Sequence, residues 1–415
     1  MPNPLPVVDV AVIGGGPAGL AAAAAAAEEG ARVRLIERNE ELGGILNQCI
    51  HDGFGLHSFG EALTGPEFAH RCIQRVHAAG VETQTDTTVA RLDRSRELVC
   101  TTRGARHTVN ARAVVLAMGC RERTPGMILM PGQRPAGVFT AGVAQWLINE
   151  ANLLVGRAVV ILGSGDVGLI MARRLTWEGA RVVAVLEKLP YHSGLARNVK
   201  QCIEDYDIPL HLSHTVSRTD GADRIERVAV TRVDDAGHPI PGSEFSLLCD
   251  TLLCSIGLIP ENELSRQAGI VLDPITGGAR VDEQLMTSVP GIFSCGNVLH
   301  IHDVADWAAA EGERAGRNAA RYAASEPIET RSSVLVSAGG GIRYVLPQSI
   351  PSTSNGLELS LRVTQPEWKA RIALWADGAR IFEIAKARVH PAEMVRITLP
   401  KLSLEPNVPI EVSLE

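Results

Sequence analysis

The sequence is poor in aromatic residues: Phe, Trp and Tyr together make up 4% of its 415 positions. It also lacks a long run of Lys or Arg, and its formal net charge is -7. Nucleic-acid-binding surfaces usually combine a basic patch with aromatic rings on which bases stack. We therefore expect no nucleic-acid partner.

Long apolar stretches are also absent near the N-terminus. The longest one, the alanine run at residues 21–27, ends in two glutamates and is too short to span a bilayer. The first predicted strand begins near residue 7, which leaves no room for a signal peptide. We expect a cytoplasmic protein without an integral membrane segment, although peripheral contact with a membrane stays open.

The eight cysteines are scattered, and none of them forms a Cys-x-x-Cys motif or stands at zinc-binding spacing from histidines. Most are expected to be small buried residues. With 45% hydrophobic and 21% charged residues, the chain has an ordinary globular composition. Its length is sufficient for about two to four domains.

A glycine-rich turn follows the first predicted strand. That strand, residues 7–13, is rich in β-branched residues, as in buried parallel sheets. Gly14, Gly16 and Gly19 then form a G-x-G-x-x-G pattern, which leads into an alanine-rich predicted helix. The next predicted strand ends in Glu37, which could accept hydrogen bonds from ribose hydroxyls. Together these parts predict a dinucleotide-binding unit with the pyrophosphate at the helix N-terminus.

The same pattern recurs later in the chain. Gly163, Gly165 and Gly168 follow a predicted strand at residues 158–162, and Glu187 ends the strand after that. An acid in this place would repel the 2′-phosphate of NADP(H), which favours NAD(H). Lys188 beside it weakens this preference. The spacing of the two turns predicts two nested domains rather than a short repeat.

Three further motifs resemble those of two-dinucleotide-binding-domain flavoproteins related to the pyridine nucleotide-disulfide oxidoreductases. "ARAVVLAMGCRERT" (111–124) and "DTLLCSIGLIPEN" (250–262) resemble the connecting motifs of that superfamily, and "TSVPGIFSCGNV" (287–298) resembles its second FAD motif. The likeness covers roughly residues 7–325. It implies an α/β fold in which a Rossmann-like NAD(H) domain is inserted into a Rossmann-like FAD domain, with FAD and NAD(H) as cofactors.

The predicted domains are an FAD-binding domain at 1–150 and 275–325, and an NAD(H)-binding domain at 151–274. A small C-terminal β domain is expected at 331–415, because "LELSLRVTQ", "RIALWADG" and "MVRITLPKLSLE" alternate as strands do and Asp377-Gly378 is a hairpin signal. The polar segment 324–333 is the predicted linker to it. This domain could bind a partner subunit or only cover the core.

The resemblance also implies which residues contact the cofactors. For FAD these are Gly14, Gly16, Pro17, Ala18, Gly19, Glu37, Arg38, Gly44, Ile45, Gly119, Gly296 and Asn297. For NAD(H) they are Gly163, Gly165, Gly168 and Glu187. Asn297 stands where the superfamily usually has an Asp on the ribityl chain, so a charge is missing there. The helix predicted after it would direct its N-terminus at the flavin pyrimidine.

The segment "ELGGILNQCIHDGFGLH" (41–57) has one cysteine where the disulfide-reducing members of the superfamily have two. No other cysteine lies within five residues of Cys49, so a dithiol relay is not expected. Two alternatives stay open. Cys49 could act alone as a thiolate or sulfenic acid with help from His51 and His57, or it could be a packed thiol near the flavin.

Several polar side chains are expected beside the flavin. Asn47, His51 and His57 could stabilise reduced flavin or accept a substrate proton, or they could be ordinary hydrogen-bonded residues. Cys49 and His51 are therefore candidate catalytic residues. His302, which follows the second FAD motif, is a third candidate.

His300, His302 and Asp303 follow the second FAD motif and could be part of the site, or two loop histidines with a capping Asp. A metal at this His-x-His pair is set aside, because no third ligand stands at a recognisable spacing. We therefore predict no metal site.

The amino-acid sequences of segment 43–69 and of "GCRERT…PGQRPAGVFTAGVAQ" also resemble those of FAD-dependent dehydrogenase subunits of bacteria. These are akin to flavoprotein subunits of dye-linked amino-acid, opine and glycerol-phosphate dehydrogenases. The resemblance implies an FAD-dependent oxidoreductase that passes two electrons between NAD(H), flavin and a second donor or acceptor, with other subunits or a second copy as partners. Two alternatives are a flavin dehydrogenase that oxidises a small amine or hydroxy acid directly, and a non-catalytic nucleotide-binding assembly subunit.

Overall fold

The computed structural model describes residues 7–324, 333–354, 356–400, 402–403 and 408–415. Contacts divide the chain into two units, one of Met1–Cys120 with Pro260–Glu415 and one of Arg121–Ile259. The predicted linker 324–333 lies outside the described residues except for its two end positions.

The larger unit is built on a seven-stranded sheet with the order β5-β2-β1-β8-β7-β6, in which β19 also pairs with β8. β2, β1, β8 and β19 run parallel to one another, while β7 pairs antiparallel with both β8 and β6. The buried positions of the parallel strands hold mainly Val, Ala, Ile and Leu, as expected for a sheet that is covered on both faces. The strands are β1 (Val7–Ile13), β2 (Val33–Ile36), β5 (Glu82–Gln84), β6 (Thr88–Leu92), β7 (Glu97–Thr101), β8 (Arg106–Leu116) and β19 (Ile292–Ser294).

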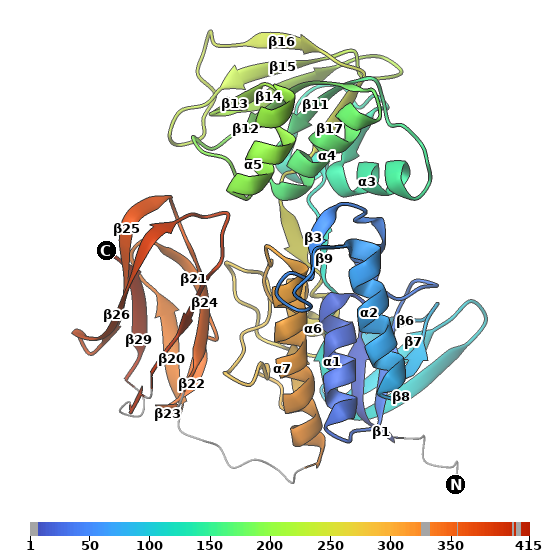
Figure 1. The fold of residues 1–415 in the computed structure, drawn as a ribbon, viewed down its shortest axis with the longest axis vertical. Coiled ribbons are helices and arrows are strands. Elements are labelled where there is room, and N and C mark those ends of the chain that lie inside the picture. Colours follow the sequence, from blue (N-terminus) through green and yellow to red (C-terminus); the bar gives the residue numbers. More distant parts are fainter. Residues whose placement is uncertain (1–6, 325–332, 355, 401, 404–407) are drawn as a thin grey trace. The chain divides into compact units, whose positions relative to one another are not determined.

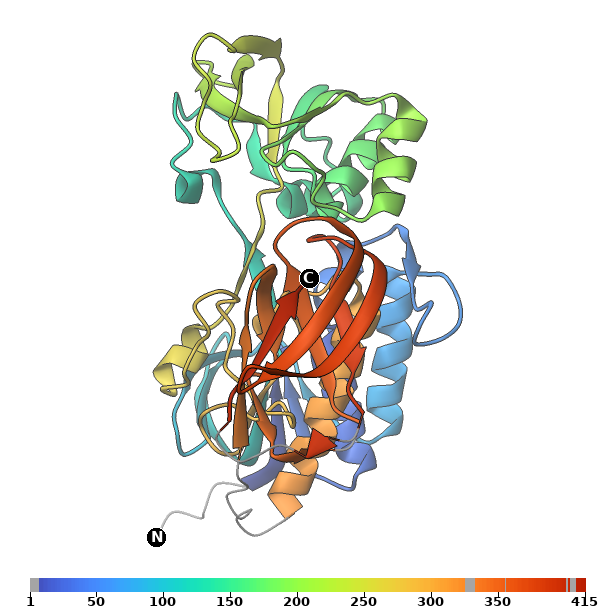
Figure 2. The ribbon, with the colours of Figure 1, turned by 90° about the vertical axis from the view of Figure 1, so that its left-hand side faces the viewer.

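Three long helices belong to this unit: α1 (Pro17–Glu28), α2 (Gly65–Ala78) and α7 (Ala305–Ala324). α2 begins with a capping box, in which the Thr64 and Glu67 side chains each bond the other's backbone N–H. Figures 1 and 2 show α1 and α7 side by side. Small residues allow this, since a Cβ on Gly312 or Gly316 would stand 2.1 Å from a backbone oxygen of α1.

The smaller unit contains a second parallel sheet, of five strands in the order β10-β17-β11-β12-β13. A separate antiparallel sheet of β14, β15 and β16 belongs to the same unit. Its elements are β10 (Val138–Thr140), α3 (Ala141–Asn149), β11 (Ala158–Leu162), α4 (Asp166–Trp177), β12 (Arg181–Glu187), α5 (Ala196–Cys202), β13 (Leu210–Leu212), β14 (His214–Asp220), β15 (Arg227–Arg232), β16 (Phe245–Leu248) and β17 (Thr251–Cys254).

The boundaries of the smaller unit differ from the predicted 151–274. β10 pairs with β17 and α3 packs on α4, so the segment before residue 151 belongs to the second sheet. The unit ends at Ile259, and the residues that follow belong to the larger unit. The chain passes between the units through β9 (Cys120–Glu122) and β18 (Leu258–Pro260), which pair with each other.

The C-terminal residues form two main sheets over a common core of Val, Ile and Leu (Figure 2). Their orders are β22-β20-β29-β25-β26 and β21-β24-β27, and a short pair of β23 and β28 adds to them. The strands are β20 (Ser333–Ala338), β21 (Ile342–Leu346), β22 (Ser349–Pro351), β23 (Thr353–Ser354), β24 (Glu358–Val363), β25 (Glu367–Ala376), β26 (Ala379–Val389), β27 (Val395–Thr398), β28 (Leu402–Ser403) and β29 (Ile410–Leu414).

The predicted hairpin at Asp377-Gly378 is confirmed. These two residues join β25 to β26, and both have positive φ, 48° and 74°. Two-residue hairpin turns of this kind match the twist of the strands that they join.

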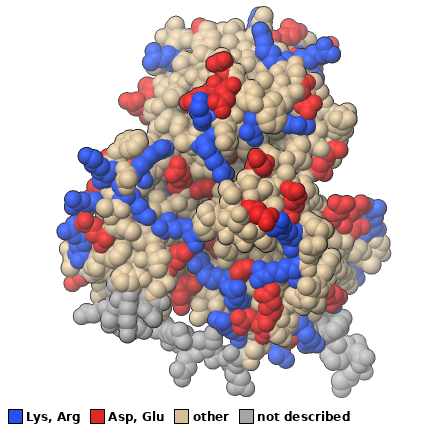
Figure 3. Space-filling view, viewed as in Figure 1, with Lys and Arg blue, Asp and Glu red and all other residues tan. Residues whose placement is uncertain are grey.

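The remaining elements are short. On the surface, the face drawn in Figure 3 carries interspersed acidic and basic side chains. None of the described helices combines the length and the apolar character that crossing a bilayer requires. The short elements are η1 (Gly44–Gln48), β3 (Asp52–Phe54), β4 (Leu63–Thr64), η2 (Pro125–Ile128), η3 (Glu204–Tyr206), α6 (Glu263–Gln267) and η4 (Gly296–Val298).

The contact between α1 and α7 predicts a large effect of Gly316→Val. The new side chain would meet the backbone oxygen of Ala22, so the two helices must move apart. We expect a loss of about 1–3 kcal/mol in the free energy of unfolding, measured by urea denaturation. Gly104→Val is the control, because nothing lies within 4 Å of the position of its Cβ. Equal stability of both variants would contradict the close contact.

Candidate functional site

The first glycine turn joins β1 to α1 and leaves open space at its centre. Gly14 has φ +105°, and a Cβ there would stand 2.4 Å from the backbone oxygen of Ala117. At Gly16 nothing lies within 4 Å of the Cβ position. No side chain caps the N-terminus of α1, so its first N–H groups stay available to a ligand. A phosphate group fits this arrangement.

The second glycine turn, between β11 and α4, repeats this geometry. Gly163 has φ +99°, and a Cβ there would stand 2.0 Å from the backbone oxygen of Ser255. α4 also begins without a side-chain cap. The second turn differs from the first in two respects. Ser255 lies beside the turn, where its hydroxyl accepts the N–H of Gly168 at 3.2 Å and lies 3.4 Å from the Cβ position of Gly165. In addition, Asp166 stands in the first turn of α4. The Asp166 carboxylate accepts hydrogen bonds from Leu195 N (2.8 Å) and Asn198 Nδ2 (2.6 Å).

The acid at the end of each second strand holds the turn beside it. Glu37 Oε2 accepts the N–H of Gly15 at 2.6 Å, and Glu187 Oε2 accepts the N–H of Ser164 at 3.1 Å. Both glutamates are buried, with 5% of each residue exposed. Glu187 also accepts the hydroxyls of Ser164 and Ser193, at 2.5 and 2.7 Å. The two turns are therefore built alike, with the acids buried beside them.

The Gly-Gly segment forms the short helix η1 next to the first turn. Gly44 approaches Gly16, since its Cβ position lies 3.0 Å from the Gly16 Cα, and the Ile45 side chain is 58% exposed. Cys49 ends η1, where its backbone oxygen accepts the N–H of Gly65 at 2.8 Å. None of the eight cysteines, all within the described residues, forms a disulfide.

The loop after Cys49 is fastened to the N-terminus of α7. The buried Asp306 carboxylate accepts the N–H groups of Gly55, His57 and Ser58 at 2.9–3.1 Å. The His57 ring also stacks on Trp307, with 4.3 Å between ring centroids. This places the predicted His57 beside α7. The predicted His51 instead packs on Phe54, with 5.1 Å between centroids.

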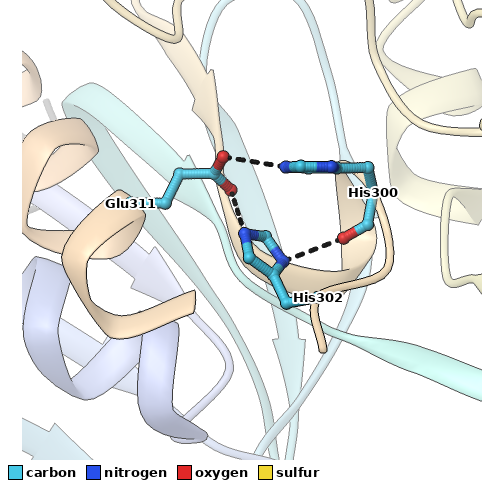
Figure 4. A group of neighbouring side chains, drawn as sticks. All are labelled: His300, His302 and Glu311. Carbon is cyan, nitrogen blue, oxygen red and sulfur yellow. Dashed lines mark hydrogen bonds and ion pairs between the residues drawn. The ribbon is translucent and has the colours of Figure 1, made fainter. Parts of the chain in front are cut away.

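A buried cluster stands where the second FAD motif meets α7 (Figure 4). His300 Nε2 lies 3.0 Å from Glu311 Oε1, and His302 Nε2 lies 3.5 Å from Glu311 Oε2. Burial lowers the pKa of His300, and the adjacent His302 ring lowers it further. Burial alone would raise the pKa of Glu311, but the two imidazoles hold it well below its usual range.

Asp303 belongs to a different contact, with the C-terminal strands. Its carboxylate pairs with the Arg362 guanidinium of β24 and accepts the N–H of Met394 at 2.6 Å. Arg362 also donates to the backbone oxygen of Ile301 at 3.0 Å and to the Tyr344 hydroxyl at 3.2 Å. The loop of the second FAD motif is therefore held by the C-terminal domain.

The other predicted cofactor residues are dispersed around this region. Asn297 Oδ1 accepts the N–H of His302 at 2.9 Å, and its amide nitrogen lies 3.6 Å from Cys120 Sγ. A Cβ on Gly296 would stand 2.6 Å from that of Ala18, which brings the second motif against α1. Gly119 has φ +72° with open space at its Cβ position, and Arg38 is exposed.

Comparison with known proteins settles the family. The model of the family "pyridine nucleotide-disulphide oxidoreductase" matches residues 8–313. The chain belongs to this family. It is an oxidoreductase enzyme with the FAD and NAD(P)H cofactors of that family. The predicted α/β class and the predicted resemblance are confirmed.

Three curated relatives are components of larger enzymes. One opine oxidase subunit from Agrobacterium tumefaciens is 26% identical over 70% of this chain. Hydrogen cyanide synthase subunit HcnB of Pseudomonas protegens is 28% identical over 62%, and the NADP(+)-dependent formate dehydrogenase subunit beta of Moorella thermoacetica is 26% identical over 75%. The matches span 61%, 58% and 43% of the lengths of these three relatives.

Solved structures share the fold. Thioredoxin reductase of T. acidophilum has a TM-score of 0.64 and 22% identity, and the match covers 77% of this chain and 99% of that one. Thioredoxin reductase of Lactococcus lactis has a TM-score of 0.63 and 21% identity, with 76% and 99% covered.

Sequence reasoning missed several residues of this region. Glu311 and Asp306 lie in an alanine-rich helix, where the sequence offers no signal that either acid points inward. Tyr344 and Arg362 lie in strands of the C-terminal domain, with no motif to link them to the second FAD motif. The sequence shows no third ligand beside the His-x-His pair, but in the structure Glu311 stands beside both histidines. The reason for predicting no metal site is therefore wrong.

The contacts of Asp306 predict that Asp306→Asn loosens the loop at residues 51–59. An amide offers one acceptor oxygen in place of two, while three N–H groups point at this side chain. We expect a loss of about 1–3 kcal/mol in the free energy of unfolding and faster proteolysis within this loop. Asp52→Asn is the control, since Asp52 lies in the same segment with an exposed side chain. Unchanged proteolysis of Asp306→Asn would show that the loop is held by other contacts.

Proposed function

We propose that this chain passes two electrons between NAD(H), FAD and a second donor or acceptor, as one subunit of a larger dehydrogenase. The observation that carries the proposal is the repeated cradle: two glycine turns, each with an uncapped helix N-terminus and a buried acid beside it. The flavin, when bound, supplies the hydride chemistry, and the residues of the chain bind and orient it.

In this proposal the first cradle holds FAD. Gly14, Gly16 and Gly19 shape the turn for the pyrophosphate, and Glu37 is the ribose partner. Support comes from the open space at Gly16 and from the absence of an acid in the first turn of α1. Pro17, Ala18, Arg38, Gly44, Ile45, Gly119, Gly296 and Asn297 complete the proposed FAD contacts.

The second cradle is proposed to hold NAD(H). Gly163, Gly165 and Gly168 form its turn, and Glu187 ends the strand beside it. A buried carboxylate there opposes the 2′-phosphate of NADP(H). The acid Asp166 in the first turn of α4 reduces the attraction for a pyrophosphate, although its hydrogen bonds direct the carboxylate toward Leu195 and Asn198.

A disulfide relay is not part of the proposal. The family includes disulfide reductases, but Cys49 is the one cysteine of the Gly-Gly segment. The proposed second electron donor or acceptor is therefore a small substrate or another subunit. Three relatives with "subunit" in their names support a partner, and all three are longer than the matched region.

The deciding experiment is anaerobic addition of NADH to the purified yellow protein. Loss of the flavin colour supports the proposal, and NADPH should act more slowly. Bleaching by a small amine or hydroxy acid but not by NADH would instead support a flavin dehydrogenase that oxidises its substrate directly. No bleaching by either would support a non-catalytic assembly subunit.

Two valine variants separate the cradles. Gly16→Val should fold normally, because its side chain enters open space, yet the protein should be purified without flavin. Gly165→Val should keep its flavin, while its reduction by NADH slows by about tenfold or more. Flavin content is measured by absorbance after denaturation, and reduction by stopped flow. Flavin retained by Gly16→Val would contradict the assignment of the first cradle.

For Cys49 we expect a packed thiol rather than a redox partner. Cys49→Ser should therefore change the rate of flavin reduction by NADH by less than about twofold. The same assay on Cys72→Ser, at another partly buried thiol of this unit, is the control. If Cys49→Ser alone slowed reduction by an order of magnitude, a thiolate or sulfenic-acid role would replace this expectation.

A further inference from the structure

The cluster of His300, His302 and Glu311 resembles an arrangement of metal ligands more than a set of isolated hydrogen bonds. It is the one group of three or more His, Cys, Asp or Glu side chains found to converge in the described part of the chain. One ligand atom from each residue lies within 4.8 Å of the others. The side chains of His300, His302 and Glu311 are 1%, 3% and 7% exposed.

The outer hydrogen bond of His302 leaves an electron pair inside the cluster. Its Nδ1 lies 3.0 Å from the backbone oxygen of His300, which can only accept, so Nδ1 carries the hydrogen. In the neutral ring Nε2 then has a lone pair, and Figure 4 shows it facing the Glu311 carboxylate at 3.5 Å. Two acceptors face each other here, and a cation between them would be attracted to both.

His300 and Glu311 have outer partners as well. His300 Nδ1 lies 3.3 Å from the Tyr344 hydroxyl, whose oxygen can accept from this ring as it does from Arg362. Glu311 Oε2 accepts the N–H of Gly296 at 2.7 Å. Each of the three side chains is thus oriented by a second bond on its outer side, which is the usual support of metal ligands.

The charges around the cluster also call for a cation. The nearby Asp303 is compensated by Arg362, since the two form a partly buried ion pair. Glu311, in contrast, contacts imidazoles and a backbone N–H in the described structure. A buried carboxylate is costly unless hydrogen bonds or a positive charge compensate it, and a metal ion between the two rings would supply that charge.

We propose that His300, His302 and Glu311 bind one divalent transition-metal ion, Zn²⁺ or Fe²⁺. Two imidazoles and one carboxylate suit these ions, whereas Mg²⁺ and Ca²⁺ prefer oxygen ligands. The ion would fasten the second FAD motif to α7 and, through Tyr344, to the C-terminal strands. It needs no change of oxidation state, and the proposal does not depend on the proposed electron transfer.

The test is metal analysis of the untagged, flavin-containing protein by inductively coupled plasma mass spectrometry. We expect about one equivalent of Zn or Fe per chain. X-ray absorption at the edge of that metal should show nitrogen and oxygen ligands at about 2.0–2.2 Å. Because it uses the unaltered protein, this measurement is valid even if a ligand variant fails to fold.

Variants locate the ion. His302→Gln and Glu311→Gln should each lower the metal content at least about tenfold, because a three-ligand site with one ligand removed binds weakly. His211→Gln is the matched control: the His211 and His214 rings also lie together, 5.5 Å apart, but no converging carboxylate is described beside them. This control should keep its metal.

Re-addition provides a second readout. Protein stripped with a chelator should take up one equivalent of Zn²⁺ or, without oxygen, Fe²⁺, and its Tm should rise. A folded wild-type protein that neither contains nor takes up these ions would overturn the proposal, and the cluster would then be a proton-bridged network. Equal metal content in all variants would also overturn it, because the ion would lie elsewhere.

Discussion

The close contact between α1 and α7 underlies the rest of the larger unit. Two glycines of α7 allow its backbone to approach the backbone of α1, so the helices meet without intervening side chains. As a result the first glycine turn, near the start of the chain, lies against the second FAD motif, which follows some 280 residues later. Asp306 and Glu311 are carried on the same helix. The site therefore depends on the absence of side chains at two positions.

The two cradles illustrate how backbone and charge share the work of binding a dinucleotide. The glycines allow positive φ and close approach, and the helix N-termini present N–H groups. The buried acids stabilise the protein itself as well, since each accepts a hydrogen bond from a backbone N–H of its own glycine turn. The cradles are not equivalent, because the acid in the first turn of α4 makes the second one less attractive to anions than the first.

The sequence predicted what depends on neighbouring residues in the chain. The first strand of each nucleotide unit, Val7–Ile13 and Ala158–Leu162, and the turn at Asp377-Gly378 follow from local patterns, and all three are found as predicted. The domain boundaries did not follow from such patterns, because the partner of β10 lies more than a hundred residues away. For the same reason Glu311 and Arg362 escaped notice. Their roles come from contacts between distant parts of the chain, which the spacing of residues along the sequence does not indicate.

The pairing of β9 with β18 has a consequence for how such a chain could diversify. The chain leaves the larger unit and returns to it through two adjacent, hydrogen-bonded strands. Its ends are therefore close in space, and domain insertions are tolerated at such points. A lineage could exchange this module for another, or lose its ligand, while the host sheet kept its own architecture.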